Sequence, residues 1–306
     1  MEGQKILVTG PAGHLTAPLV RELAKSNAVW GMARFSNPAQ QAELEAIGVT
    51  CVKKDMATDS FDDVPDDFDY VFHAGAMVAM DSEKDMAYTF AVNAQGTARL
   101  MVHCKAVKTF VHCSTAGVYA HAAQPRRETD PYGSIIPAYS LSKIAAEQLV
   151  YFISEHWRIP TIILRIGAVY GFDATGPAVR LDRMVRGKEI WVNPTEPRGA
   201  SIMWQGDAVR LALAAFEAGG LPAVTVNFSG DEQVSIEEYC TYVGQLLGIE
   251  PSFKFTEGTY PAGAIDTTLM HEVLGHCETT WKDGFRQLAA HRYPTLYAEA
   301  QGDAPR

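Results

Sequence analysis

The chain lacks the features that mark membrane and secreted proteins. No segment has 18 consecutive apolar residues, so no membrane-spanning helix is expected. The five cysteines show no C-x-x-C spacing, and Met1–Lys5 carries no signal-peptide pattern. These absences predict reduced thiols, a cytoplasmic location and no membrane partner.

Basic charge is also scarce. The 306 residues carry 26 Lys and Arg against 36 Asp and Glu, a formal net charge of −10. This balance argues against nucleic acid or an anionic membrane as the main partner and leaves a small-molecule substrate. The length and the hydrophobic content of 47% fit one α/β domain with a smaller appendage.

Metal-binding spacing is absent as well. His271 and His276 lie in H-E-V-L-G-H, where the second histidine comes one residue too late for the H-E-x-x-H motif. Two histidines five apart do not share a helix face. We therefore expect no metal site.

What the chain does contain is an alternation of apolar runs and amphipathic stretches. The predicted strands are Lys5–Val8, Ala28–Met32, Thr50–Val52, Tyr70–His73, Phe110–Cys113 and Thr161–Ile166. The predicted helices between and after them are Gly13–Lys25, Pro38–Ala46, Asp85–Ala106 and Ala138–His156. This order predicts a doubly wound, parallel α/β sheet. Further along, the pattern predicts helices at Val179–Arg186, Gly206–Ala218 and Ile236–Leu247 and a strand at Val224–Phe228.

Two local motifs suggest chemistry. The turn Val8-Thr9-Gly10-Pro11-Ala12-Gly13 joins the first strand to the first helix, and a helix N-terminus after such a turn binds phosphate. Tyr139 and Lys143 are four residues apart, so they share one face of a helix. A nearby cation favours the phenolate, which would suit Tyr139 to proton transfer.

These motifs belong to an ordered set along nearly the whole chain. The set comprises T-G-P-A-G-H-L-T at 9–16, H-A-G-A at 73–76, V-N-A-Q-G-T at 92–97, C-S-T-A-G-V-Y at 113–119, Y-S-L-S-K at 139–143, L-R-I-G-A-V-Y-G at 164–171 and G-D-A-V-R at 206–210. In this set the chain resembles the extended short-chain dehydrogenase/reductase superfamily, in its NAD(P)-dependent epimerase/dehydratase-like branch.

The resemblance implies a Rossmann dinucleotide-binding domain and a smaller C-terminal substrate-binding lobe. The domain would span residues 1–167, with 202–228 returning to it, and the lobe would comprise 168–201 and 229–306. It also implies a homodimer formed by the helices Asp85–Ala106 and Ala138–His156.

By the same resemblance, the cofactor-binding residues are Gly10, Gly13, His14, Leu15, Arg34, Asp55, Met56, His73, Ala74, Gly75, Tyr139 and Lys143. The family's third glycine falls at Thr16, which should loosen the packing of helix on strand. The acid that holds a ribose 2′-hydroxyl falls at Ala33, and Arg34 follows it. This favours NADP(H), with NAD(H) as the alternative.

For catalysis, the resemblance makes Tyr139 the general acid/base and gives Lys143 the roles of lowering its pKa and binding ribose. Thr115 would bind the substrate oxygen, with Ser114 as the fallback, and Asn93 would support the local geometry.

The residues expected near the substrate depart from the nucleotide-sugar enzymes of the family. Ala168 and Ala200 stand where those enzymes carry an Asn and an Arg for the diphosphate, with Arg198 close but out of register. Ala116-Gly117 stands where the 4,6-dehydratases carry Asp-Glu. Met77, Met80, Thr115, Ala168, Tyr170, Trp191 and Trp204 are the predicted substrate-binding residues, and most of them are apolar.

We therefore expect an NAD(P)-dependent oxidoreductase that interconverts a secondary alcohol and a ketone on a non-nucleotide, partly apolar substrate. The alternative is a sugar or nucleotide-sugar epimerase or dehydratase that retains its cofactor. A non-catalytic dinucleotide sensor is the third reading, against which Thr115, Tyr139 and Lys143 weigh.

Overall fold

The computed structural model describes residues 1–134, 136–173, 176–195, 198–259 and 263–302. Its centre is a seven-stranded sheet in the order β10-β6-β5-β4-β1-β2-β3, and every pairing in it is parallel. The strands are β1 (Lys5–Thr9), β2 (Ala28–Ala33), β3 (Thr50–Lys53), β4 (Tyr70–His73), β5 (Thr109–Thr115), β6 (Thr161–Ile166) and β10 (Val224–Phe228). The predicted doubly wound sheet is confirmed, including the return of the late strand Val224–Phe228.

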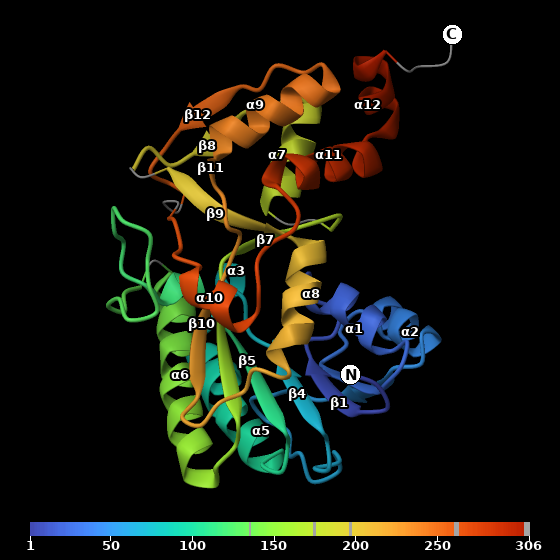
Figure 1. The fold of residues 1–306 in the computed structure, drawn as a ribbon, viewed down its shortest axis with the longest axis vertical. Helices are drawn as coiled ribbons and strands as arrows, with labels where there is room; N and C mark the ends of the chain where they lie inside the picture. Colours follow the sequence, from blue (N-terminus) through green and yellow to red (C-terminus); the bar gives the residue numbers. More distant parts are fainter. Residues whose placement is uncertain (135, 174–175, 196–197, 260–262, 303–306) are drawn as a thin grey trace.

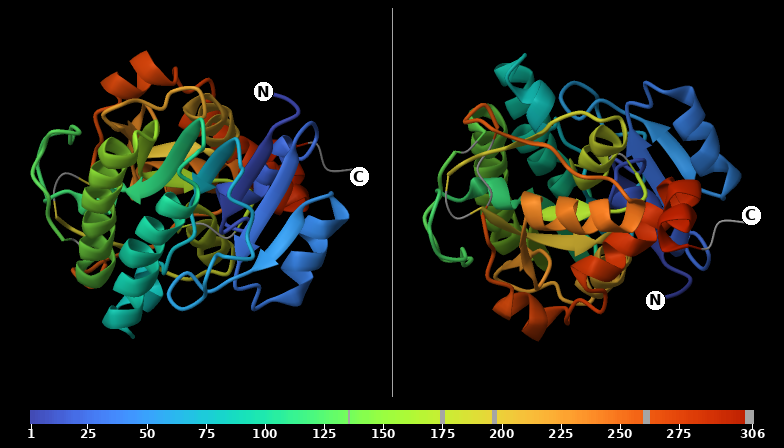
Figure 2. Two further views of the ribbon diagram at one scale, coloured as in Figure 1. Left: turned by 90° about the horizontal axis from the view of Figure 1, so that it is seen from below. Right: turned by 90° about the horizontal axis from the view of Figure 1, so that it is seen from above.

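Helices cover both faces of this sheet (Figure 2). Alternation along β1 sends Ile6 and Val8 to one face and Leu7 to the other. The first face packs against α1 (Thr16–Leu23), α2 (Pro38–Ala46), α8 (Gln205–Ala215) and α10 (Thr268–Val273). The second face packs against α5 (Thr97–His103) and α6 (Pro137–Trp157).

The predicted helix Asp85–Ala106 is not one regular helix. It consists of α4 (Met86–Phe90), the π-helix η1 (Ala91–Gly96) and α5, and the short helix α3 (Ala79–Ser82) precedes it. Gly96 ends the π-helix against Met56, where an added Cβ would lie 2.7 Å from the Met56 carbonyl oxygen. The sequence periodicity could not show this wider turn, because one π-turn changes the helical phase only locally.

A second, smaller core lies above the carboxyl edge of the sheet, in the upper part of Figure 1. Its strands are β7 (Ala168–Tyr170), β9 (Gly199–Trp204) and β11 (Gln233–Ser235) in one sheet and β8 (Ile190–Val192) and β12 (Phe253–Phe255) in another. Its helices are α7 (Gly176–Val185), α9 (Ile236–Leu247), α11 (Trp281–Arg292) and α12 (Pro294–Gln301). The domain boundaries given by the resemblance stay a prediction.

Local chemistry explains where several helices begin. Asn37 caps α2 by accepting a hydrogen bond from the Ala39 N–H, and Pro38 follows at the first helical position. Ser235 and Glu238 form a capping box on α9. Among the described residues, no helix is both long enough and apolar enough to cross a bilayer.

Candidate active site

A cavity of ≈ 310 Å³ opens where β1, β2 and β4 end. In a parallel α/β sheet this edge is the usual place for a dinucleotide. The predicted cofactor residues that line it are Gly10, Gly13, Arg34, Asp55, Met56, Ala74 and Gly75. The topology therefore brings residues from separate loops into one cleft.

The glycine turn fits this cleft tightly. Gly10 has φ +63°, and an added Cβ would lie 3.1 Å from the Gly75 Cα. Thr16 is buried, and its hydroxyl accepts from the Gly13 N–H at 3.0 Å and donates to the Gly10 carbonyl at 2.5 Å. The Thr16 side chain thus ties the turn to the start of α1, and the expected looser packing of the helix on the strand stays a prediction.

His14 and Leu15 lie at the start of α1, outside the lining of this cleft. His14 lines a separate cavity with Arg21 and Asp173. Leu15 is the N-cap residue and packs against the core of the first sheet face. Their backbone N–H groups, rather than their side chains, are suited to a phosphate.

His73 is fully buried and does not line the cleft. Its Nε2 lies 2.7 Å from Thr97 Oγ1, which itself donates to the Asn93 carbonyl, so Nε2 is the donor. Its Nδ1 then accepts from the Thr9 hydroxyl at 2.7 Å, and that hydroxyl accepts from the Gly75 N–H. Burial, and then the Lys143 charge, lower the pKa of His73 to about 3, which keeps the ring neutral. His73 thus positions the cleft wall, and a direct contact of its side chain with a cofactor has no support in this geometry.

Asn93 joins this wall to the catalytic helix. Its Oδ1 accepts from the Met77 N–H at 2.7 Å, and its Nδ2 donates to the Met77 carbonyl and to Ser142 Oγ. Met77 lines the cleft, and Ser142 lies on α6. The predicted supporting role of Asn93, which lies in the π-helix, thus has a geometric basis.

Tyr139 and Thr115 come together from α6 and the end of β5. The Thr115 hydroxyl hydrogen-bonds the Tyr139 phenol, and it also accepts from the Gly117 N–H at 3.1 Å. Burial raises the pKa of Tyr139, the bond to Thr115 opposes this rise, and the Cys113 thiol adds to it. The phenol therefore holds its proton in this arrangement.

Lys143 has a partner that the helix spacing did not predict. Its ammonium is buried and donates to the Cys113 carbonyl at 2.6 Å. Burial lowers the pKa of Lys143 to about 8, against smaller opposing effects of Cys113 and Glu147. Sequence spacing does not reveal this carbonyl, because it lies on a strand that only the packing of α6 on the sheet brings alongside. The predicted action of Lys143 on the pKa of Tyr139 stays a prediction.

Ser114 points away from Thr115, because successive strand residues face opposite sides. Its hydroxyl donates to Glu147 Oε1 at 2.5 Å, and Glu147 forms a buried ion pair with Arg165 at 2.7 Å. The Arg165 guanidinium also donates to the hydroxyls of Tyr119 and Tyr132 at 3.0 Å each. The fallback role of Ser114 at a substrate oxygen is therefore not supported.

The adenosine end of the cleft carries two cations. Arg34 is exposed and donates to the Tyr88 hydroxyl at 3.2 Å, and Tyr88 donates to Asp55 Oδ2 at 2.6 Å. Lys54 also lines this end. Sequence reasoning missed Tyr88 and Lys54. Lys54 directly precedes the predicted Asp55, so the sequence could have indicated a positive charge at this position. Tyr88 lies on α4, far from Asp55 along the chain, so no sequence pattern indicated it.

The structure does not bring the predicted substrate residues into one pocket. Met77 lines the cleft, Met80 is 88% exposed on α3, and Ala168 is exposed at the start of β7. Tyr170 is fully buried in the small lobe, where its hydroxyl donates to the Trp281 carbonyl at 3.1 Å. This burial argues against Tyr170 as a ligand contact.

The two predicted tryptophans also lie elsewhere. Trp204 is buried and packs edge-on against Tyr170 with ring centroids 5.4 Å apart. Trp191 is exposed on β8 and lies under the guanidinium of Arg183 at 5.1 Å. Both positions correspond to packing within the lobe, so the substrate assignments of Trp191 and Trp204 have no support in this geometry.

Comparisons with known proteins show the family of this chain. The sequence model described as "NAD dependent epimerase/dehydratase family" matches residues 6–220. A curated Bacillus subtilis (strain 168) relative, named "Uncharacterized UDP-glucose epimerase YtcB", is 24% identical over 297 residues, which are 91% of this chain and 89% of that protein. A dTDP-D-glucose 4,6-dehydratase of Homo sapiens is 27% identical over 188 residues, covering 55% of this chain and 52% of that protein.

Solved structures show the same fold. A UDP-glucuronic acid 4-epimerase from Bacillus cereus, in complex with UDP-glucuronic acid and NAD, has a TM-score of 0.82 at 22% identity and covers 94% of this chain and 100% of that one. A UDP-N-acetylglucosamine 4-epimerase from Methanobrevibacter ruminantium M1, in complex with UDP-N-acetylmuramic acid, has a TM-score of 0.84 at 16% identity and covers 98% of this chain and 100% of that one.

Proposed function

We propose that this chain, which belongs to the NAD dependent epimerase/dehydratase family, is an epimerase that acts on nucleotide sugars. It would oxidise a secondary alcohol to a ketone and return the hydride to the opposite face. The observation that carries this proposal is the contact of Tyr139, on α6, with Thr115 at the end of β5. Asn93 links α6 to the dinucleotide cleft through its bonds to Ser142 and Met77. The 4,6-dehydratase reaction is less well supported, because Ala116-Gly117 offers no acid or base for the loss of water.

The cleft residues fit a nicotinamide dinucleotide. The space beside Gly10 is closed to a side chain by Gly75, and α1 begins directly after the turn, so backbone N–H groups are the natural phosphate contacts. When bound, the oxidised cofactor would supply a hydride acceptor and a positive charge.

Tyr139 would take the alcohol proton, and Thr115 would orient the substrate oxygen. Added positive charge near the phenol lowers the pKa that burial has raised, so proton transfer becomes available when the site is loaded. Lys143, with a pKa near 8, adds to this charge whenever it is protonated. The Cys113 carbonyl holds its ammonium in the buried layer under the site.

A second candidate is a net alcohol dehydrogenase acting on a non-nucleotide substrate, the first expectation from the sequence. The comparisons fit it less well than the epimerase. It is kept because Ala168 offers no donor to a diphosphate and because Arg198 is engaged within the lobe. The Arg198 guanidinium donates to Glu237 Oε1 at 2.5 Å and lies 5.6 Å from the centre of the Phe255 ring.

The cofactor preference also remains a proposal. The UDP-glucuronic acid 4-epimerase structure from Bacillus cereus is named as a complex with NAD, and the names of the similar structures give no support to NADP(H). Around the adenosine end, however, Ala33 offers no acid to a 2′-hydroxyl, whereas Arg34 offers positive charge. Lys54 also lines the cleft, but its ammonium is paired with Asp63. We propose that both dinucleotides bind and that Arg34 sets their ratio.

The test is incubation with UDP-glucose, UDP-glucuronic acid and UDP-N-acetylglucosamine, followed by NMR of the products. Appearance of the C4 epimer without a stoichiometric change in reduced nicotinamide is the expected result, and it should be lost in Tyr139→Phe. Turnover of added cofactor with simple secondary alcohols, and no epimer, would instead establish the second candidate. Binding of these sugars weaker than about 100 μM would point the same way, because two lost diphosphate contacts cost about 3–6 kcal/mol.

A further inference from the structure

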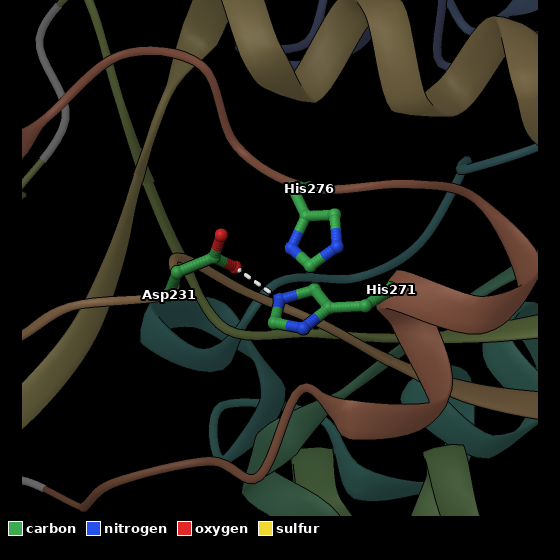
Figure 3. A group of neighbouring side chains, drawn as sticks. All are labelled: Asp231, His271 and His276. Atoms are coloured by element: carbon green, nitrogen blue, oxygen red, sulfur yellow. Dashed lines mark hydrogen bonds and ion pairs between the residues drawn. The ribbon is translucent and has the colours of Figure 1, made fainter.

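We propose that Asp231, His271 and His276 form a binding site for a divalent transition metal ion of the Zn²⁺ class. One ligand atom of each residue lies within 4.8 Å of the others. Figure 3 shows the Asp231 carboxylate with a ring nitrogen of each histidine directed toward it. The site lies apart from the dinucleotide cleft, since none of its three residues lines that cleft.

A chain reversal explains why the histidine spacing gave no metal motif. His271 lies on α10, whose last turn closes with Leu274 and Gly275 both donating to the Met270 carbonyl. Gly275 then has φ +105°, a conformation that favours glycine. This reversal carries His276 back over His271, with ring centroids 4.0 Å apart. The expectation of no metal site assumed a continuous helix, which ends before the second histidine.

The third ligand is held by the packed loop after β10. Gly230 lies against the Ile202 carbonyl so closely that a side chain would have no room, which fixes the residue before Asp231. Asp231 Oδ2 accepts from the Cys277 N–H at 3.0 Å, and Oδ1 accepts from His271 Nε2 at 2.7 Å. The carboxylate is therefore oriented by a backbone donor and aimed at the imidazoles.

The donor set suits zinc better than calcium or magnesium. Two imidazole nitrogens and one carboxylate oxygen are common ligands of Zn²⁺, whereas Ca²⁺ and Mg²⁺ prefer oxygen alone. Ligand bonds of about 2.0–2.1 Å in a tetrahedron place two ligands roughly 3.3 Å apart. His271 Nε2 and Asp231 Oδ1 would thus separate slightly from 2.7 Å, and the Nε2 hydrogen would move to Nδ1.

Cys277 contributes to the site through its backbone, whose N–H donates to Asp231 Oδ2 at 3.0 Å. Asp231 and His276 are exposed and His271 is half-buried, so an ion could reach the site and water could fill the fourth position. A bound ion would join the loop after β10 to the segment that leads into the small lobe.

The experiment is calorimetric titration of the full-length, untagged protein with Zn²⁺. We expect saturation at one ion per chain and at least about tenfold weaker binding in Asp231→Asn and His276→Ala. Asp231→Asn keeps an oxygen for the Cys277 N–H, so the fold is preserved, which a thermal melt without metal checks. Glu272→Gln is the matched control, since it removes an exposed carboxylate beside His271, and it should bind like the parent.

Visible absorption of Co²⁺ gives a second readout, because nitrogen ligation produces bands that free Co²⁺ in water lacks. These bands should appear with the parent and vanish with Asp231→Asn. Failure to saturate at one equivalent, or equal affinity in all variants, would overturn the site. Equal binding of Mg²⁺ would show only exposed negative charge and would overturn it as well. None of these readouts depends on the proposed epimerase activity.

Discussion

At the scale of single residues, the site is set by which atom each polar group contacts. Tyr139 meets Thr115, whereas Lys143 meets the Cys113 carbonyl. Burial favours the uncharged form of both side chains, because it raises the pKa of Tyr139 and lowers the pKa of Lys143. A loaded cleft is needed to reverse this bias, so proton transfer is coupled to cofactor binding.

Removing the phenol tests the proton-transfer role. Tyr139→Phe should lower kcat by about 10²–10⁴ while dinucleotide affinity stays nearly unchanged, because only the acid/base group is lost. Steady-state kinetics and cofactor titration measure the two effects. Tyr242→Phe, in the small lobe, is the control. Parent-like turnover in Tyr139→Phe, with chemistry limiting the rate, would refute the role.

The cation at the adenosine end sets the second prediction. Arg34→Ala should weaken NADP(H) roughly ten- to 150-fold, because a charge-assisted phosphate contact contributes about 1.5–3 kcal/mol, and it should weaken NAD(H) much less. Arg21→Ala, on α1 outside the cleft, is the control. Equal losses for both dinucleotides in a fluorescence titration would mean that Arg34 only stacks on adenine.

At the scale of elements, α6 organises the site because it contacts three neighbours through buried polar groups. Ser142 binds Asn93 of the π-helix, Lys143 binds β5, and Glu147 binds Arg165 of β6. Two residues of the π-helix contact neighbouring segments: Asn93 carries the amide that holds Met77, and Gly96 lets Met56 approach. Each contact fixes the helix relative to the sheet edge.

The buried ion pair under α6 gives a stability prediction. Glu147→Ala should lower the free energy of unfolding by about 3–5 kcal/mol, because it leaves the Arg165 charge buried without its partner. Urea denaturation followed by circular dichroism measures this loss. Glu155→Ala, an exposed carboxylate on the same helix, should change it by less than about 0.5 kcal/mol. Similar values for the two variants would contradict the argument.

At the scale of the whole molecule, the sheet buries two histidines side by side. His73 and His112 have ring centroids 5.5 Å apart, and within the described residues neither nitrogen of His112 has a hydrogen-bond partner. Burial, then Lys143, then His73 hold the pKa of His112 well below its usual value. The folded chain therefore keeps this ring neutral at a pH where the unfolded chain protonates it.

The sign of the pH effect follows. Below the unfolded pKa of about 6.5 the unfolded state binds the extra proton, so each such histidine destabilises the fold as the pH falls, by about 1.4 kcal/mol per pH unit. Between about pH 6 and 5, the free energy of unfolding of His112→Leu should fall by about 1.4 kcal/mol less than that of the parent. At pH 7.5 the substitution should change the free energy of unfolding little. The exposed His156→Leu is the control. If the free energy of unfolding, measured with urea, falls equally with pH in His112→Leu and in the parent, His112 is not kept neutral by the fold.

Assembly is the last prediction. On α6, Phe152 is 63% and Leu141 is 45% exposed, and such apolar side chains on one helix suit a partner copy. We propose the homodimer that the family resemblance implies, through α6 and the helices from Met86 to His103. Light scattering should give a dimer for the parent and a monomer for Phe152→Glu, with Glu155→Ala unchanged. A monomeric parent at micromolar concentration would exclude it.

The sequence by itself determined the features that depend on neighbours along the chain. Gly10 and Gly13 specify the turn, and the alternation of strands with helices along the chain specifies the parallel sheet. The ordered motifs locate Thr115, Tyr139 and Lys143. The turn and the sheet follow from local sterics and periodicity, which act within a few residues, and the three catalytic positions follow from the family resemblance.

Only the tertiary structure decided which partner each buried polar group takes. Lys143 binds a strand carbonyl, Ser114 faces Glu147, Tyr170 packs in the lobe, and Asp231 meets two histidines from a segment 40 residues later. A buried donor must find an acceptor, and the acceptor comes from whichever element the packing of apolar faces brings alongside. That choice depends on contacts between distant segments, which periodicity and spacing do not encode.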